Sequence, residues 1–210
     1  MLESNEESGD INQKPRSDKM VSNNNVTWKV IVGGQGGVGK TTFLHRYLTD
    51  QFLGSTAMTV GVQLHTHSVE RLGKKIGLIL WDLGGQERFR PVQGAYIRGA
   101  VAAIMAFDMS RHMATLGQLK EWIKMVRTHA SPNIPILLIG TKQDLLDDED
   151  KAMVDEEANA FIKKMDLYKY IPTSSKSGRN VEESVLSLID VLLLQKLNLS
   201  TSARALSLDG

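Results

Sequence analysis

The stretch Gly34-Gln35-Gly36-Gly37-Val38-Gly39-Lys40-Thr41 decides the fold class, and it comes just after the short apolar segment 28–32. It matches the pattern G-x-x-x-x-G-K-[ST] at every position. The glycines let the backbone curl into a nest whose N–H groups point at phosphate oxygens, and the helix that opens there adds the positive end of its dipole. In this motif the lysine reaches the β- and γ-phosphates and the threonine hydroxyl binds Mg²⁺. A glycine-rich turn without a ligand is the alternative, but the Gly-Lys-Thr ending between a strand and a helix favours a nucleoside triphosphate site.

Apolar segments alternate with helix-like segments along most of the chain. The strand-like segments are residues 28–32, 62–69, 75–83, 101–107, 134–139 and 168–172, and the helix-like ones are residues 41–48, 116–129, 155–165 and 181–194. Runs that are apolar on both faces are typical of a largely parallel sheet covered by helices. Arg71-Leu72-Gly73-Lys74 joins two of the strands as a hairpin. We therefore predict an α/β fold, a doubly wound P-loop sandwich with a mostly parallel six-stranded sheet, one antiparallel edge strand and about five helices.

The two ends of the chain differ in composition from its middle. Residues 1–26 are rich in Asn, Ser, Asp and Glu, too polar to bury a core, and are predicted to be a disordered N-terminal tail; an arm that docks on a partner is the alternative. Residues 27–197 are predicted to be a single domain and residues 198–210 a short C-terminal tail.

The bulk composition excludes several classes of function. The chain of 210 residues has no cysteine, which rules out disulfides, thiolate metal sites, cysteine nucleophiles and cysteine-borne lipids. A formal net charge of +1 gives no indication of nucleic acid as a partner. No apolar run approaches the roughly 20 residues of a membrane span. We expect a cytoplasmic monomer without a direct lipid anchor, recruited to membranes only through partners.

Two further motifs follow strand-like segments. Gly140-Thr141-Lys142-Gln143-Asp144 follows the segment 134–139, and Thr173-Ser174-Ser175-Lys176 follows the segment 168–172. With the glycine-rich stretch they resemble the Ras superfamily of small GTPases, whose guanine-binding motifs are [NT]-K-x-D and S-[AS]-K, and the resemblance covers residues 28–194.

The resemblance implies how the base is recognised. Asp144 accepts hydrogen bonds from N1–H and the 2-amino group of guanine, whereas adenine would leave this carboxylate unpaired, a mismatch that sites can penalise by roughly 10⁴-fold. Lys142 and Lys176 lay their aliphatic stems along base and ribose, and the Ser175 N–H meets the guanine O6. Thr141 replaces the commoner Asn of the family. The implied nucleotide-binding set is Gly34, Gln35, Gly36, Gly37, Val38, Gly39, Lys40, Thr41, Thr42, Thr59, Gly85, Thr141, Lys142, Asp144, Ser174, Ser175 and Lys176.

The hydrolytic residues are implied in the same way. Trp81-Asp82-Leu83-Gly84-Gly85-Gln86-Glu87 resembles the W-D-x-[AG]-G-Q-E of the family, in which Asp82 holds Mg²⁺ through a water, the Gly85 N–H contacts the γ-phosphate and Gln86 orients the attacking water. Lys40 is the second implied catalytic residue. Residues 87–91 would form the second switch.

Thr59-Val60-Gly61 resembles the first switch. Its threonine would complete the metal set of Thr41, Thr59 and Asp82; an ordinary threonine at a strand entry is the alternative. Gly36 occupies a position where a side chain is expected to crowd the glutamine, so hydrolysis should be intact.

The resemblance implies an enzyme that hydrolyses GTP to GDP and phosphate with Mg²⁺ and switches two loops, in signalling or in vesicle or cytoskeletal regulation. Its partners would be guanine nucleotides, effectors, exchange factors and GAPs. Arg90 and Arg98 are candidate internal arginines only by proximity, so we expect slow turnover and a GAP arginine worth about 10³–10⁵ in rate, as in the family. A non-hydrolysing GTP-binding scaffold is the alternative. Some motifs resemble the Rab branch and others the septum-promoting branch, and an archaeal Rab-like protein would look the same.

Overall fold

The protein is described by a computed structural model that covers residues 26–55 and 57–206, with side chains placed as far as residue 197. Only Val26 of the predicted N-terminal tail lies within this range, so the prediction for residues 1–25 falls outside the described residues. The same holds for residues 207–210 of the predicted C-terminal tail.

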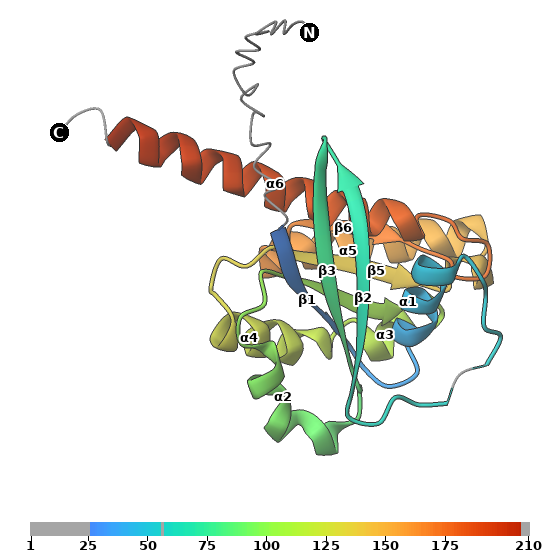
Figure 1. Ribbon diagram of the computed structural model, residues 1–210. Helices are drawn as coiled ribbons and strands as arrows, with labels where there is room; N and C mark the ends of the chain where they lie inside the picture. Colours follow the sequence, from blue (N-terminus) through green and yellow to red (C-terminus); the bar gives the residue numbers. More distant parts are fainter. Residues whose placement is uncertain (1–25, 56, 207–210) are drawn as a thin grey trace, which may run out of the picture.

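A single six-stranded sheet forms the centre of the molecule (Figure 1). Its strands are β1 (Val26–Gly33), β2 (Val62–Arg71), β3 (Lys74–Leu83), β4 (Ala102–Asp108), β5 (Ile136–Thr141) and β6 (Lys169–Pro172). The strand order is β2-β3-β1-β4-β5-β6, and every neighbouring pair is parallel except β2 with β3. The sheet therefore confirms the predicted fold class, with β2 as the antiparallel edge strand.

The predicted hairpin joins β2 to β3 through a two-residue turn. Leu72 and Gly73 both have positive φ, 50° and 68°, and Arg71 pairs with Lys74 across the turn. Positive φ at both central positions matches the right-handed twist of the strands that the turn connects.

Six α-helices surround the sheet within the described residues. They are α1 (Lys40–Thr49), α2 (Arg90–Ile97), α3 (His112–Thr115), α4 (Leu119–His129), α5 (Asp148–Met165) and α6 (Val181–Leu206), with short 3-10 turns η1 (Glu87–Phe89), η2 (Met109–Arg111) and η3 (Gln143–Leu145). No helix in this part of the chain is long and apolar enough to cross a membrane.

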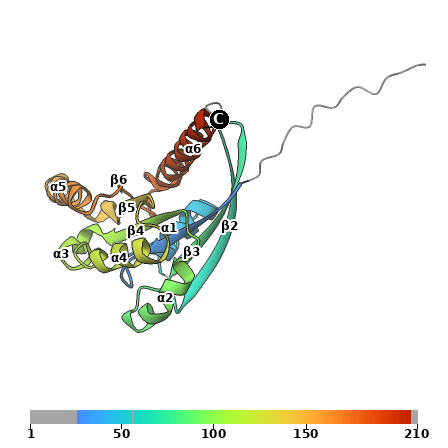
Figure 2. The same cartoon turned by 90° about the vertical axis from the view of Figure 1, so that its left-hand side faces the viewer.

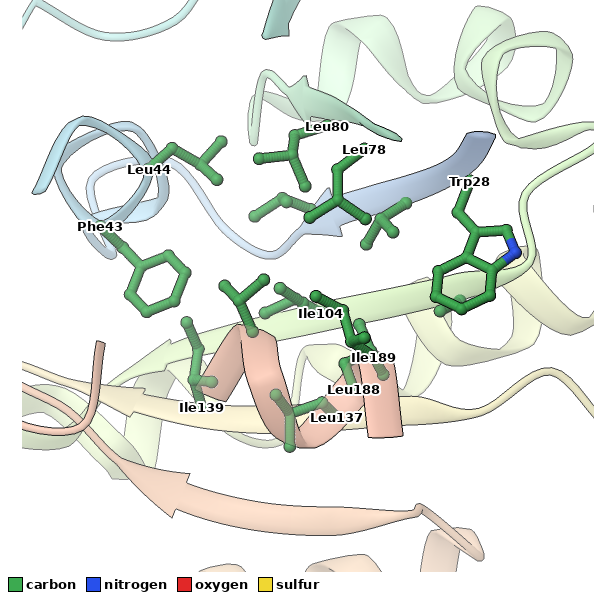
Figure 3. Packing of buried hydrophobic residues seen from close by; sticks show 14 of the residues in the cluster. Trp28, Phe43, Leu44, Leu78, Leu80, Ile104, Leu137, Ile139, Leu188 and Ile189 are labelled. Atoms are coloured by element: carbon green, nitrogen blue, oxygen red, sulfur yellow. The ribbon is translucent and has the colours of Figure 1, made fainter. Parts of the chain in front are cut away.

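Helices lie on opposite faces of the sheet (Figure 2). A separate hydrophobic layer packs between sheet and helices on each face. On one face, Val30 and Val32 belong to a cluster with Phe43 of α1 and Leu188 of α6. Figure 3 shows part of this cluster and labels Phe43 and Leu188 in it. On the other face, Ile31 packs with residues of α2, α4 and α5. Alternate residues of β1 point to opposite faces because side chains alternate along a strand, and burial on both faces fixes β1 in the middle of the sandwich.

Several helices differ from their predicted bounds. Helix α5 begins seven residues earlier than predicted, because the Asp147 carboxylate caps it by accepting a hydrogen bond from the Asp150 N–H at 2.8 Å. Helix α6 continues twelve residues past the predicted end at 194, since its sequence contains no Gly or Pro, and its end projects beyond the sheet (Figure 1). The predicted helix 116–129 starts at Leu119.

Candidate nucleotide-binding site

The glycine-rich stretch forms a tight loop between β1 and α1. Gly34, Gly37 and Gly39 have positive φ of 135°, 76° and 96°, a region that other residues rarely adopt. A Cβ at Gly34 would lie 2.3 Å from the carbonyl oxygen of Ala106. Both the curl of the loop and its close approach to β4 therefore require glycine.

The Lys40 ammonium lies within this loop. Its Nζ donates to the carbonyl oxygens of Gly34 at 2.8 Å and Gln35 at 2.9 Å, and only 5% of the residue is exposed. Burial lowers the pKa of Lys40 to about 8, against the opposing charge of Asp82. The lysine is thus a cation held in the loop with little solvent around it, where an anion would stabilise its charge.

The three predicted metal ligands converge from three separate elements. The Thr41 hydroxyl lies 2.5 Å from Asp82 Oδ2 and 2.6 Å from the Thr59 hydroxyl. Asp82 is fully buried, its Oδ1 has no partner among the described residues, and burial raises the pKa of its carboxyl against the hydrogen bond from Thr41. Two hydroxyls and a carboxylate with a free oxygen are the hard oxygen ligands that Mg²⁺ prefers, so these residues fit the ion.

The segment after β3 closes over the glycine-rich loop. A Cβ at Gly85 would lie 2.2 Å from Gly36 N and 2.5 Å from the Gly34 carbonyl oxygen, so only glycine fits there. Gln86 lines a small cavity of about 50 Å³ together with Lys40 and Thr59. The structure therefore brings the predicted hydrolytic residues around one space.

At Gly36 the structure leaves room for the first atom of a side chain. A Cβ there would lie 3.7 Å from Met58 Sδ and 3.9 Å from the carbonyl carbon of Gly85, which are ordinary contact distances. The nearest neighbours are thus Met58 and Gly85, and the first side-chain atom at this position leaves Gln86 uncrowded.

A larger cavity of about 450 Å³ contains the predicted base-recognition residues. Asp144, Lys142, Ser175 and Lys176 line it, and so do Thr42 and the half-exposed Phe52 and Leu53. Ser174 lies behind the wall of this cavity, fully buried, and its hydroxyl donates to Asp144 Oδ1 at 2.5 Å. Sequence reasoning did not find Phe52 and Leu53, because they belong to a loop without a recognisable motif.

Thr141 contacts the glycine-rich loop. Its hydroxyl lies 2.5 Å from the carbonyl oxygen of Val38 and 3.0 Å from that of Phe107, and the residue is 2% exposed. The threonine that replaces the commoner asparagine therefore joins three neighbouring segments at the sheet edge.

Asp108 is a central residue of the site that sequence reasoning missed. It ends β4, its side chain is 1% exposed, and its Oδ2 accepts from Lys142 Nζ at 2.6 Å and from Arg111 Nε at 3.0 Å. Burial favours the neutral form, but the hydrogen bonds from Lys142, Ser110 and Arg111 hold the pKa of this carboxyl below its usual range. The available signal was its place directly after a buried strand, where ligands of open α/β sheets bind.

The two arginines considered as internal candidates lie elsewhere. Arg90 pairs with Glu87 and Glu121. Arg98 is exposed at the end of α2, and its carbonyl oxygen accepts from Lys29. Neither lines the cavities described above.

The fold and this loop geometry define a P-loop protein of the α/β class. A model of the Ras family matches residues 29–193, which is most of the chain. The protein belongs to the Ras family, whose members are small GTPases that bind guanine nucleotides with Mg²⁺ and act as switches.

Proposed function

We propose that this protein binds GTP with Mg²⁺ and hydrolyses it to GDP and phosphate, as a molecular switch. The observation that carries the proposal is that Gly37 and Gly39 line both cavities. The residues that we propose for Mg²⁺ and for hydrolysis would therefore lie at one end of a continuous site, and the residues proposed for the base would lie at the other.

The base end would select guanine. Asp144 faces the larger cavity with one oxygen held by Ser174, so its carboxylate is oriented before a ligand arrives. An oriented carboxylate suits the two adjacent N–H donors of guanine and leaves adenine without a matching pair.

The phosphate end would perform the reaction. Gln86 would orient a water whose oxygen attacks the γ-phosphorus, and the bond from that phosphorus to the β–γ bridging oxygen breaks, which gives GDP and phosphate. Lys40 would stabilise the charge on the β- and γ-phosphates. When bound, Mg²⁺ would neutralise further charge there, held by Thr41 and Thr59 with Asp82 beside them.

The switch would consist of the segments around Thr59 and Gln86. Both approach the phosphate end, and the segment around Thr59 carries exposed apolar side chains: Met58 is 57% exposed and Val60 is 64% exposed. An exposed apolar surface next to a nucleotide-sensitive loop suits effectors, exchange factors and GAPs. The motifs favour a Rab-like or septum-promoting role in the cytoplasm, in signalling or in vesicle or cytoskeletal regulation.

Phosphate release in vitro tests hydrolysis directly. We expect slow release by the wild type and at least tenfold slower release by Gln86→Leu, since the leucine cannot orient water. Equal slow release over hours by both proteins, with GTP binding intact, would instead support the non-hydrolysing scaffold.

A further inference from the structure

We infer that Arg111 is a positioning residue that slows nucleotide release, because it fastens the glycine-rich loop to the end of β4 beside Lys142. This inference rests on the proposed GTP site and adds a residue to it. Neither the motifs nor the resemblance pointed to Arg111.

Three segments meet at the backbone carbonyl of Gly37. Arg111 ends η2, and its guanidinium donates to Asp108 Oδ2 at 3.0 Å and to the Gly37 carbonyl oxygen at 3.4 Å. Lys142, directly after β5, donates to the same two acceptors at 2.6 Å and 3.2 Å. Two cations from different segments thus donate to the same loop carbonyl, and both also donate to the same carboxylate.

The charges of this cluster do not balance. Asp108 is the only ion-pair partner of both Arg111 and Lys142 among the described residues. Two cations and one carboxylate leave an excess of one positive charge at the rim of the loop. The Arg111 side chain is 54% exposed, so part of this positive charge faces solvent. Excess positive charge at this rim favours a bound polyphosphate over an empty site.

The position of Arg111 favours a role in retaining the bound nucleotide over a role in GTP hydrolysis. Lys40, Thr59 and Gln86 line the cavity at the phosphate end, and Arg111 does not. Arg111 touches Gly37, which both cavities share, so its contact restrains the part of the loop between phosphate and base. On this proposal the loop moves away from the segments around it during release, so a contact such as that of Arg111 with Gly37 would raise the cost of that movement.

Arg111 can be replaced without leaving the buried Asp108 carboxylate unpaired. Removing Arg111 leaves Asp108 still paired with Lys142, so no buried carboxylate loses all its partners. Removing Asp108 instead would leave two cations unpaired, and its effect would combine release with folding.

The test is the release of mant-GDP from the full-length protein in Mg²⁺, chased with excess GDP. We expect Arg111→Ala to release mant-GDP roughly 3–10-fold faster, because it loses one exposed charge-assisted hydrogen bond to the loop. The release rate of Arg111→Lys should fall between those of the wild type and Arg111→Ala, because lysine keeps the charge but lacks the planar guanidinium that can donate to two acceptors. Arg98→Ala, which removes an exposed arginine away from the site, should release at the wild-type rate.

The salt dependence of nucleotide release distinguishes an electrostatic contact of Arg111 from a purely structural role. The difference between wild type and Arg111→Ala should shrink between 0.05 and 0.5 M KCl, since exposed charge interactions are screened. A difference that does not change with salt, together with a lower Tm of the nucleotide-free variant, would overturn the inference in favour of a general packing role.

Two further outcomes would also overturn it. One is identical release by wild type and Arg111→Ala. The other is unchanged release with single-turnover hydrolysis slowed by about 10²-fold or more, which would make Arg111 a catalytic residue. Failure of the wild type to bind mant-GDP at all would instead refute the proposed GTP site.

Discussion

The two ends of the candidate site are built differently. At the base end the side chains are held by residues at or just after strand ends: Asp144 by Ser174, which follows β6, and Lys142 by Asp108, which ends β4. The loops after β5 and β6 are further tied by backbone bonds, such as Thr173 N–H to the Gly140 carbonyl at 2.6 Å. At the phosphate end, Thr59 and Gln86 lie on connecting segments outside the strands and helices. A rigid end suits recognition of an unchanging base, and a loop-built end suits a γ-phosphate that the proposed hydrolysis would remove.

Asp144→Asn should have the largest effect at the rigid end. The amide presents a donor where the carboxylate accepted, so we expect guanine nucleotide affinity to fall by about 10³-fold or more and xanthine nucleotides to bind better than guanine nucleotides. Competition binding with GDP and XDP measures both. The matched comparison is Ser174→Ala, which keeps the Asp144 carboxylate but removes the hydrogen bonds of the Ser174 hydroxyl with Asp144 and with the Ser177 N–H; it should weaken GDP binding by about fivefold. An Asn variant that still prefers guanine would remove the base-recognition argument.

Asp108→Asn tests whether the rigid end is formed before nucleotide binds. This substitution removes a buried carboxylate from two partly exposed cations, so we expect the nucleotide-free protein to lose about 1–3 kcal/mol of unfolding free energy. Because the pKa of Asp108 is lowered in the folded state, its stabilisation is present above the ordinary value near 3.8 and is lost only as pH falls through the lower folded value.

Urea unfolding of both proteins at pH 5 and pH 8 measures this. The difference between wild type and Asp108→Asn should be the same at the two pH values. A difference that appears only when nucleotide is bound would show that the base end is assembled by its ligand.

Thr59→Ala should have the smallest effect, confined to the loop-built end. We expect Mg²⁺ to bind the GTP complex about tenfold more weakly, the GDP complex to change less than twofold, and the nucleotide-free protein to keep its stability. Titration of Mg²⁺ into the two complexes checks the asymmetry, with Thr49→Ala on the far end of α1 as control. Equal weakening of both complexes, or none, would favour the alternative of an ordinary threonine at a strand entry.

Features that depend on adjacent residues could be predicted from the sequence. The glycine-rich loop is contiguous, and the buried strands are long apolar runs, so both leave local patterns. Helix α2 was missed because its sequence contains Pro91 and Gly94, which favour turns. Its structure depends on distant contacts: Gln93 donates to the Gly84 carbonyl at 2.7 Å, and Ile97 is fully buried.

The sequence by itself determined the fold class, the phosphate loop and the residues that a guanine site would need, because each is encoded by a short pattern of glycines, charges or apolar runs. Only the tertiary structure decided how the site is held together. Arg111 lies 74 residues from Gly37, and Asp108 lies 34 residues from Lys142. No local pattern marks such pairs, because they meet only where parallel strands end at the same edge of the sheet.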